Sequence, residues 1–520
     1  MDLSSLDNKW DLIVIGGGVT GAGVFREAVR CGLKVLLVEK NDFAWGTSSR
    51  SSKMVHGGLR YLKEGRILLT RTAVRERERL LSEAPGLVEP LEILVPVYSD
   101  HGPGRRALEV GLSIYDFMAH EKQHSFLSPR LCQSLVPHLL MENLVGGFRF
   151  WDAKVDDARL VLRLIEEGCD QGGSALNYVA VEHIDRDAEG AVTGVGLIDG
   201  EKGIRKNMST RAVVNATGAW AERLHASPKE NLHLRPLRGS HLIFSQADLP
   251  ISQTVSFFHK QDKRPIFISP WEGVVLLGTT DMDHGPGLDV EPTVSEEEAQ
   301  YLMQGLHDHF PFLNTRLSDC VATLAGIRPV LSEGKRAPSQ ESRDSVVWVD
   351  NGLVTVTGGK LTTFRKMAVD TLKAVRPFLP SLPSEIDEDI LVFDPAPGID
   401  MPPAGISQAA WRRICGRYGS RADELVHGAR PEDLCAIPGT ETLWCEIPFA
   451  ARYGRIRHLS DLMLRRVRLG LLVPDGGRTI MDRVKHLCRP LLPWDNTRWV
   501  AEISEYLRSY KRHHGVPKIP

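Results

Sequence analysis

The chain has 520 residues, with 64 Lys and Arg against 66 Asp and Glu. This length allows about three domains, and the balanced charge excludes a general electrostatic affinity for nucleic acid. No two of the eight cysteines lie closer than ten residues apart, which excludes C-x-x-C zinc, iron–sulfur and redox arrangements, so we expect no metal and reduced thiols in a cytosolic compartment.

The N-terminal part of the chain predicts a binding site for a dinucleotide. Its first ten residues are polar and lead directly into a strand, so we expect no signal peptide. Residues 12–15 form a buried apolar strand that runs into Gly16-x-Gly18-x-x-Gly21 and a helix. Gly16 allows the turn, Gly18 lets backbone N–H groups approach a pyrophosphate, and Gly21 lets the helix lie close to the strand.

A second apolar strand, residues 34–39, ends in Glu39, 18 residues after Gly21. A carboxylate at this point accepts hydrogen bonds from both hydroxyls of an adenosine ribose and repels a 2′-phosphate. An isolated glycine motif is also compatible with an ordinary turn. The order of strand, helix, strand and acid favours a dinucleotide.

Three segments follow before residue 121. The polar residues 47–53 and the adjoining residues 54–62 suit contacts to a second phosphate and to a ring system, and the alternative is a solvated loop. Residues 70–81 are rich in Arg and Glu at helical spacings and predict an exposed helix. Residues 104–120 carry an apolar helical stripe, which indicates either core packing or a face for a membrane or partner.

The middle of the chain changes its pattern twice. Asp156 or Asp157 caps a helix, and strands are expected over residues 175–181 and 192–197. The strand at 211–215 then ends in Ala216-Thr217-Gly218, small residues that let a flat ligand approach the backbone. Residues 235–321 instead show antiparallel strands, which predicts a second domain inserted into the first.

The nucleotide-domain pattern returns near residue 326 and ends in a second glycine-rich junction. Two strands lead into Gly358-Gly359-Lys360-Leu361-Thr362-Thr363, and a helix covers residues 364–375. This junction aims backbone N–H groups at an electron-rich group, although a simple capped helix is the alternative. Seven prolines between residues 377 and 403 mark a linker, and residues 406–520 predict helices.

Eight motifs, in this order, closely resemble the aerobic, respiratory FAD-dependent glycerol-3-phosphate dehydrogenases. They are the glycine fingerprint, Thr47-Ser48-Ser49 with Ser51-Ser52-Lys53, His56-Gly57-Gly58-Leu59-Arg60-Tyr61-Leu62, Val155-Asp156-Asp157-Ala158-Arg159-Leu160, Asn215-Ala216-Thr217-Gly218, Gly278-Thr279-Thr280-Asp281, Gly326-Ile327-Arg328-Pro329 and Gly358-Gly359-Lys360-Leu361-Thr362-Thr363. That family is similar in fold to D-amino-acid oxidase and glycine oxidase.

The resemblance implies an α/β fold in which an FAD-binding, Rossmann-like domain is interleaved with an antiparallel-sheet substrate domain and followed by a helical C-terminal domain. The implied FAD-binding domain is discontinuous. The expected boundaries are 10–90, 150–234 and 322–376 for that domain, 91–149 and 235–321 for the substrate domain, 377–403 for the linker and 404–520 for the helical domain.

The resemblance also implies oxidation of sn-glycerol 3-phosphate to dihydroxyacetone phosphate, with electrons passed from FAD to a membrane quinone. We expect FAD without a covalent link, because the sequence marks no Cys or His as an attachment site. Expected cofactor-binding residues are Gly16, Gly18, Gly21, Glu39, Thr47, Ser48, Ser49, His56, Gly57, Leu59, Ala216, Gly218, Gly359, Lys360, Leu361 and Thr362. Expected substrate-binding residues are Arg60, Tyr61, Arg328, Arg343 and Lys360, and expected catalytic residues are His56, His241, Arg328 and Lys360.

Two other functions fit the same fold. One is an oxidase that uses oxygen and acts on glycerol 3-phosphate or on an amine or amino acid. The other is a flavin-holding module without turnover, against which Arg60, Arg328 and Lys360 argue, since an idle site has no need for several desolvated cations.

The expected location is the cytoplasm, with peripheral attachment to the inner face of the membrane, where a quinone dissolves. No apolar run reaches the roughly 18 residues that span a bilayer. Residues 452–520 carry 15 Lys or Arg and 6 Asp or Glu, a net charge of 15 − 6 = +9. Either this basic tail or the apolar stripe of residues 108–118 is expected to meet the lipid, and a homodimer is compatible with the sequence.

Overall fold

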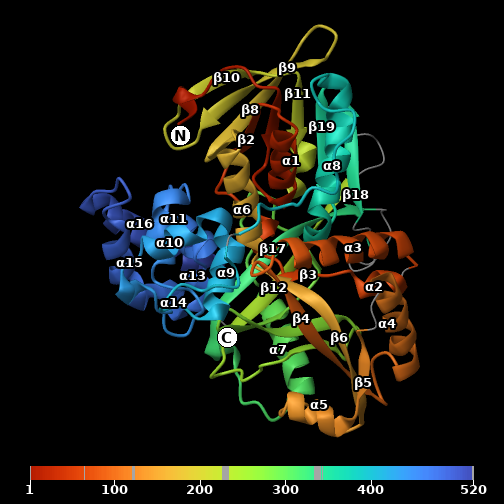
Figure 1. The fold of residues 1–520 in the computed structure, drawn as a ribbon. Coiled ribbons are helices and arrows are strands. Elements are labelled where there is room, and N and C mark those ends of the chain that lie inside the picture. The colour runs from red at the N-terminus through yellow and green to blue at the C-terminus, as the bar shows by residue number, and fades with distance from the viewer. Residues whose placement is uncertain are drawn as a thin grey trace.

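The computed structural model describes residues 2–63, 65–119, 123–224, 233–332, 341, 344–396 and 398–517. These residues form two lobes, with the C-terminal helices packed beside the junction of the lobes (Figure 1). The upper lobe in that view contains the nucleotide-type sheet, and the lower lobe contains the larger antiparallel sheet.

The upper lobe is built on a six-stranded sheet. Its strands are β1 (Leu12–Ile15), β2 (Val35–Glu39), β7 (Ser174–Asn177), β11 (Ala212–Asn215), β18 (Ser345–Asp350) and β19 (Leu353–Gly358). The order is β18-β19-β11-β1-β2-β7, and only the β18–β19 pair is antiparallel. β1, in the middle of the sheet, is apolar at every position because both faces of the sheet are covered.

Alternate residues of β1 pack against different layers. Leu12 and Val14 belong to the core shared with α1 (Val19–Arg30), α6 (Asp157–Asp170) and α8 (Phe364–Val375). Ile13 and Ile15 belong to the core on the opposite face. That face is covered by a three-stranded sheet of β8 (Val179–Arg186), β9 (Val192–Asp199) and β10 (Arg205–Ser209).

The strand predicted over residues 175–181 is two strands. Tyr178 adopts a φ of 60°, a left-handed conformation that ends β7 and starts β8 in another direction. β7 joins the parallel sheet and β8 joins the three-stranded sheet. Apolar periodicity gave no sign of this division, because apolar residues continue on both sides of Tyr178, with Leu176 before it and Val179 after it.

The lower lobe contains a ten-stranded sheet, made of a path of eight strands with two further strands paired to it. Its strands are β3 (Met54–Val55), β4 (Val88–Tyr98), β5 (Ser125–Leu127), β6 (Leu144–Val155), β12 (His233–Ser245), β13 (Thr254–Phe258), β14 (Pro265–Trp271), β15 (Val274–Gly278), β16 (Met282–Asp283) and β17 (Cys320–Ser332). The path runs β16-β12-β15-β14-β13-β4-β6-β3, with β17 paired to β12 and β5 to β6. This confirms a second, mainly antiparallel domain interleaved with the first.

Further helices lie in the two lobes and make up the C-terminal part of the chain. Outside the parallel sheet lie α2 (Leu59–Lys63), α3 (Ile67–Glu83), α4 (Arg105–Ala119), α5 (Pro129–Leu135) and α7 (Glu296–His309). The C-terminal part contains α9 (Gln408–Tyr418), α10 (Ala422–His427), α11 (Glu446–Tyr453), α12 (Leu459–Asp461), α13 (Leu469–Leu472), α14 (Pro474–Gly477), α15 (Met481–Cys488) and α16 (Asn496–His513). The helices expected near residues 70–81, 104–120 and 364–375 are confirmed, as is the helical tail. The first helix is half-buried and not exposed as expected, since Thr70, Ala73, Val74, Arg77 and Leu80 are buried. The exact domain boundaries stay a prediction.

The C-terminal helices are joined to the nucleotide lobe by buried ion pairs. Asp42, which follows β2, accepts hydrogen bonds from Arg466 at 2.7 Å and 2.5 Å and is also paired with Arg465. Asp157, the first residue of α6, is paired in the same way with Arg468. Each of these side chains is at least nine-tenths buried, so the charges depend on one another for solvation.

We expect Asp42→Asn to lower the free energy of unfolding by about 3–5 kcal/mol, because Arg466 loses its buried counter-charge and Arg465 keeps only its pair with Asp461. Burial opposes ionisation, but Arg466 and Arg465 hold the pKa of Asp42 at about 2, below its usual value of 3.8. This stabilisation is therefore present above the usual pKa and is lost as the pH falls toward 2. Urea unfolding measured at several pH values checks both points.

The matched control is Asp170→Asn, which removes a pair with Arg421 between α6 and the same C-terminal part. Both side chains of that pair are partly exposed, so its loss should cost less than about 1 kcal/mol. Equal losses in the two variants would contradict the role given to Asp42.

Candidate active site

A cavity of about 1380 Å³ is lined by residues from both lobes. Its wall combines the turn after β1, the end of β2, the segment between β2 and α2, and parts of β14, β17 and the β19–α8 junction. Small-molecule sites usually occupy about 300–1,000 Å³. The cavity therefore has room for a dinucleotide together with a second small ligand.

The turn after β1 has the geometry that a pyrophosphate needs. Gly16 has a φ of 110°, and a Cβ there would lie 2.6 Å from the Ala216 carbonyl oxygen. A Cβ on Gly21 would lie 1.9 Å from the Gly16 oxygen, so glycine alone fits at that contact. Gly18 is the N-cap of α1 and makes no side-chain cap. Apart from the Val19 N–H, which donates to Ser48, this helix N-terminus suits an anion bound in the cavity.

Glu39 is held where a ribose is expected. Its Oε2 accepts a hydrogen bond from the Gly17 N–H at 2.7 Å, and its Oε1 accepts one from the Asn41 N–H at 2.8 Å. Burial raises the pKa of Glu39, while these two amides oppose the shift. The carboxylate lines the cavity and keeps lone pairs available for hydroxyl donors.

The polar segment after β2 meets α1 and β17. Ser48 Oγ accepts a hydrogen bond from the Val19 N–H at 2.9 Å, and Thr47 Oγ1 donates one to the Ile327 carbonyl. Both residues line the cavity. The hydroxyls therefore lie at the cavity wall, as expected for contacts to a phosphate and a ring.

Lys53 does not make the phosphate contact that its motif suggested. Its Nζ donates to the Ser49 carbonyl at 2.7 Å and to Asp157 at 2.9 Å, and the residue is absent from the cavity wall. Burial first, and then the neighbouring Arg468, lower the pKa of Lys53 to about 8. Its position was unpredictable because the acid and the arginine that surround it are far away in sequence.

Arg328, on β17, is fixed at the cavity by three acceptors. Its Nη1 donates to Asp281 Oδ1 at 2.9 Å and to the Thr280 carbonyl at 3.1 Å, and its Nη2 donates to Thr279 Oγ1 at 3.0 Å. A Cβ at Gly239 would lie 2.3 Å from Arg328 Nη2, so that glycine makes space for the guanidinium group. The cation is thus oriented before any ligand arrives.

The β19–α8 junction places a second cation beside an aromatic ring and also contacts the segment before α2. Lys360 Nζ lies 3.6 Å from the centre of the Tyr61 ring. The His56 N–H donates to Thr362 Oγ1 at 3.2 Å, and the Thr362 hydroxyl is at the same distance from the His56 carbonyl. Both glycine-rich segments therefore meet at one wall of the cavity.

His241 does not line the cavity itself but contacts a residue that does. It is 1% exposed, and its Nε2 lies 2.8 Å from the hydroxyl oxygen of Ser52, which lines the cavity. Burial, followed by the charges of Arg328 and Lys53, lowers the pKa of His241 well below its usual value. The imidazole is therefore neutral at pH 7 and touches the cavity through Ser52.

The structure brings most of the predicted site residues together. Fifteen of them line the cavity: Gly16, Gly18, Glu39, Thr47, Ser48, His56, Leu59, Tyr61, Ala216, Gly218, Arg328, Gly359, Lys360, Leu361 and Thr362. Gly21, Ser49, Gly57 and His241 lie behind that wall. The Arg60 side chain and all of Arg343 lie outside the described residues. The roles of all these residues stay predictions.

Sequence reasoning missed several charged residues at this site, of which three bear on its chemistry. Arg264 and Asp152 line the cavity, and Asp281 is the buried partner of Arg328. Asp281 had a weak signal, since it follows two threonines at a strand end. Arg264 sits in a polar turn and Asp152 within a strand, and neither pattern is distinctive.

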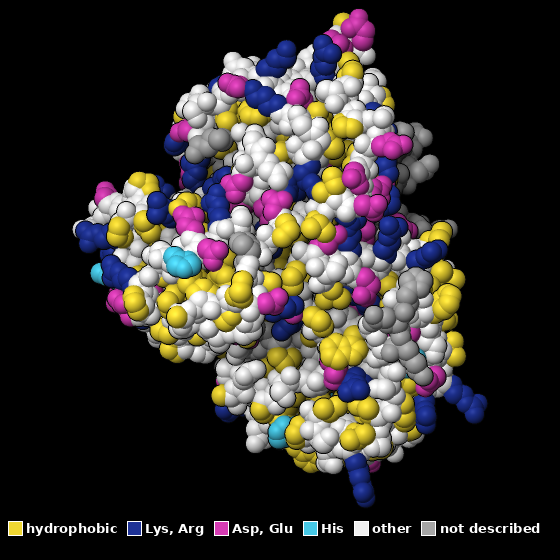
Figure 2. All heavy atoms as spheres, viewed as in Figure 1, with side chains coloured by type: hydrophobic (Ala, Val, Ile, Leu, Met, Phe, Trp, Pro, Cys, Tyr) yellow, Lys and Arg dark blue, Asp and Glu magenta, His cyan; other side chains and the backbone are white. Residues whose placement is uncertain are grey.

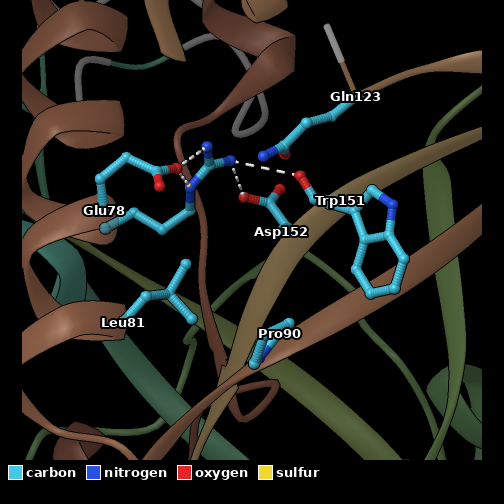
Figure 3. Close-up of a pocket in the computed structure, with 7 residues that line it drawn as sticks. Glu78, Leu81, Pro90, Gln123, Trp151 and Asp152 are labelled. Carbon is cyan, nitrogen blue, oxygen red and sulfur yellow. Dashed lines mark hydrogen bonds and ion pairs between the residues drawn. The ribbon is translucent and has the colours of Figure 1, made fainter. Parts of the chain in front are cut away.

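Asp152, on β6, also borders a smaller pocket of about 180 Å³. Figure 3 shows Glu78 and Asp152 on opposite sides of one guanidinium group, and both are paired with it, the group being that of Arg77. Asp152 Oδ1 also accepts a hydrogen bond from the Tyr115 hydroxyl at 2.9 Å. Tyr115 in turn accepts one from the Gly57 N–H at 2.8 Å, so this network holds the segment that carries His56.

Comparisons with known proteins agree with this geometry. Residues 11–365 match the family model described as FAD dependent oxidoreductase, and residues 356–499 match the C-terminal domain of alpha-glycerophosphate oxidase. An aerobic glycerol-3-phosphate dehydrogenase of Staphylococcus aureus (strain MRSA252) is 32% identical over 491 residues, covering 88% of this chain and 87% of the relative.

Solved structures show the same likeness. The glycerol-3-phosphate dehydrogenase from Bacillus halodurans, complexed with FAD, has a TM-score of 0.79 at 25% identity, covering 99% of this chain and 97% of that one. The L-alpha-glycerophosphate oxidase from Mycoplasma pneumoniae, with FAD bound, has a TM-score of 0.58 at 19% identity, covering 71% and 95%. At 19% identity, the oxidase structure shows only that the two proteins share a fold.

We expect Gly57→Ala to reduce the FAD content of the purified protein and to destabilise it by about 1–3 kcal/mol, because the added Cβ overpacks the core. That Cβ would lie 2.4 Å from the Tyr115 hydroxyl and 2.5 Å from Val74 Cγ2. Gly104→Ala is the control, since a Cβ there meets nothing within 4 Å. Flavin absorbance per protein and thermal unfolding are the measurements, and normal values for Gly57→Ala would refute the packing argument.

Proposed function

The chain belongs to the family of FAD-dependent glycerol-3-phosphate dehydrogenases, and from this premise we propose the roles of its cavity residues, its electron acceptor and its membrane contact. The protein is an FAD-dependent enzyme that oxidises sn-glycerol 3-phosphate to dihydroxyacetone phosphate. One observation carries the assignment of roles. The oriented cations Arg328 and Lys360 share a cavity with the glycine turn and with Glu39.

The residues present fit an FAD. The turn at Gly16 and Gly18 receives the pyrophosphate, Glu39 receives the adenosine ribose, and the wall at His56 and Thr362 receives the ring system. Bound FAD supplies the hydride acceptor of the reaction. The described cavity wall contains no cysteine, which supports binding without a covalent link.

Arg328 and Lys360 bind the substrate. A phosphate monoester carries nearly two negative charges, and a guanidinium group binds it through charge-assisted hydrogen bonds. Arg328 and Lys360 hold the phosphate or polarise the alcohol oxygen, on which negative charge develops as its proton leaves. Tyr61 packs beside Lys360 and limits where its ammonium group can move.

The proton of the hydroxyl group needs an acceptor. His56 lines the cavity directly, whereas His241 reaches it through the Ser52 hydroxyl. His241 is neutral at pH 7 because its pKa is lowered, and a neutral imidazole can accept a proton. We assign proton transfer to these two histidines, with Ser52 as the link for the second.

We expect glycerol 3-phosphate to bleach the flavin band of the holoenzyme under anaerobic conditions, and a quinone to restore it faster than air does. Arg328→Ala should lower kcat/KM for glycerol 3-phosphate roughly 30- to 1000-fold while FAD stays bound. Bleaching only by an amine or amino acid would refute the substrate. Faster reoxidation by air than by quinone would favour the oxygen-using oxidase.

An apolar surface on α3 and α4 supports a peripheral membrane contact. Ile67 and Leu68 on α3, and Val110, Ile114 and Phe117 on α4, are exposed. We call these five residues the α3–α4 surface. Figure 2 shows hydrophobic side chains along the edge of the molecule where Figure 1 places α4. Within the described residues, the helices are too short or too polar to cross a bilayer, so attachment would be at the surface.

The basic tail offers less charge to a membrane than its composition suggests. Three of its arginines, Arg465, Arg466 and Arg468, are buried against acids of the nucleotide lobe. They cannot meet lipid headgroups while the domains are docked. The α3–α4 surface is therefore the better candidate for the contact.

The same surface adjoins the cavity. Val110 and Ile114 are exposed and also line the cavity, together with Ala107. A quinone dissolves in the hydrocarbon of the bilayer, so an opening at an apolar surface gives it access to the flavin. This supports a quinone acceptor and a location at the inner face of the cytoplasmic membrane. A homodimer stays a prediction.

We expect Phe117→Ser to weaken flotation with lipid vesicles about 10- to 100-fold, because burial of an aromatic side chain stabilises by about 1.5–3 kcal/mol. Phe117 is 81% exposed. The control is Phe312→Ser, since Phe312 is 72% exposed but follows α7, away from the α3–α4 surface. Equal flotation of both variants and the parent would refute this contact.

A further inference from the structure

Arg264 is a cavity residue with incomplete hydrogen bonding. It lies between β13 and β14, directly before Pro265, and its side chain is 18% exposed. Its Nη2 is 3.5 Å from Asp281 Oδ2, and its Nη1 is 3.4 Å from the Asp281 carbonyl oxygen. Its buried Nε has no hydrogen-bond partner in the described part of the chain.

Other mostly buried arginines of this protein are better paired. Arg413 donates to Glu446 at 2.8 Å and to Glu272 at 3.1 Å, and Arg77 donates to Asp152 at 2.9 Å. Both contacts of Arg264 are at the outer limit of a hydrogen bond. A guanidinium group has five N–H donors, and leaving them unmatched in a partly dry site is unfavourable. Arg264 therefore retains donors for a ligand.

The second observation is the place of Arg264 beside Arg328. The Asp281 carboxylate is fully buried, and its two oxygens face different arginines, Oδ1 facing Arg328 and Oδ2 facing Arg264. Both arginines line the same cavity. One carboxylate thus holds two guanidinium groups side by side and reduces the repulsion between them.

We propose that Arg264 is a second phosphate-binding arginine, which grips the phosphate monoester of the substrate together with Arg328. This inference rests on the function proposed above. Two planar donor groups around one acid match a group that has three acceptor oxygens and nearly two negative charges. Asp281 is the positioning residue for both arginines.

A purely structural role makes a different prediction. If Arg264 only held Asp281 in place, its loss would disturb Arg328 and slow the hydride-transfer step itself. A phosphate-binding role instead raises the concentration of substrate needed for half-saturation, because the interaction exists before and during the reaction. The half-saturation concentration and the rate at saturation therefore distinguish the phosphate-binding role from the structural role.

The test uses FAD-loaded protein and anaerobic rapid mixing with sn-glycerol 3-phosphate. Arg264→Gln should raise the half-saturation concentration about 10- to 100-fold, with the flavin reduction rate at saturation nearly unchanged. The inhibition constant of inorganic phosphate, competing with substrate, should rise by a similar factor. Lys260→Gln is the control, because it removes one charge from an exposed residue of the same turn and should change these values less than about twofold.

The outcomes separate this inference from the proposed function. If glycerol 3-phosphate fails to reduce the parent enzyme, the proposed function fails. If the parent is reduced normally and Arg264→Gln keeps both its half-saturation concentration and its phosphate inhibition, the inference is wrong and the function stands. A fall in the saturated rate alone also overturns the inference.

Arg264→Lys is the second variant, used where Arg264→Gln loses FAD. It keeps the charge but lacks the two-pronged donor geometry. A raised half-saturation concentration with a normal saturated rate supports the proposal, and values equal to those of the parent overturn it.

Discussion

Three parts of the molecule meet at the buried carboxylate of Asp157. It accepts hydrogen bonds from the Ser51 N–H at 3.0 Å and the Ser51 hydroxyl at 2.7 Å, and so anchors the segment beside the flavin site. It also binds Lys53 and Arg468, the latter from the C-terminal helices. A buried carboxylate with this many donors is fixed in position. The neighbouring Ser52 hydroxyl therefore has a defined position next to His241.

Buried acids that are held by several donors also occur elsewhere around the cavity. Asp281 orients Arg328 and Arg264, Asp152 with Arg77 and Tyr115 holds the segment at Gly57, and Glu39 is held by backbone amides. In each case a buried acid is satisfied within the protein before a ligand arrives. Groups fixed in this way need little reorganisation during the reaction, which is the main source of electrostatic catalysis. The cost is that the site depends on distant parts of the chain.

This dependence explains which features the sequence could predict. The glycine turn with Glu39 and the junction at Lys360 depend on local backbone geometry, so their patterns were sufficient to place them at one cavity. Lys53 and Arg264 depend on acids that long-range pairing brings near, and no local pattern encodes that. Tyr178 shows the same limit in the fold, since one apolar run became strands of two different sheets.

The interleaved strand order also has a consequence for synthesis of the protein. β1 lies between β2 and β11, and β11 pairs next with β19, which ends at Gly358. In the lower lobe, β4 and β6 pair early, but their neighbour β13 begins only at Thr254. A growing chain therefore exposes open, apolar strand edges until more than half of it has left the ribosome. Such edges favour aggregation, so protection by chaperones should matter most during this interval.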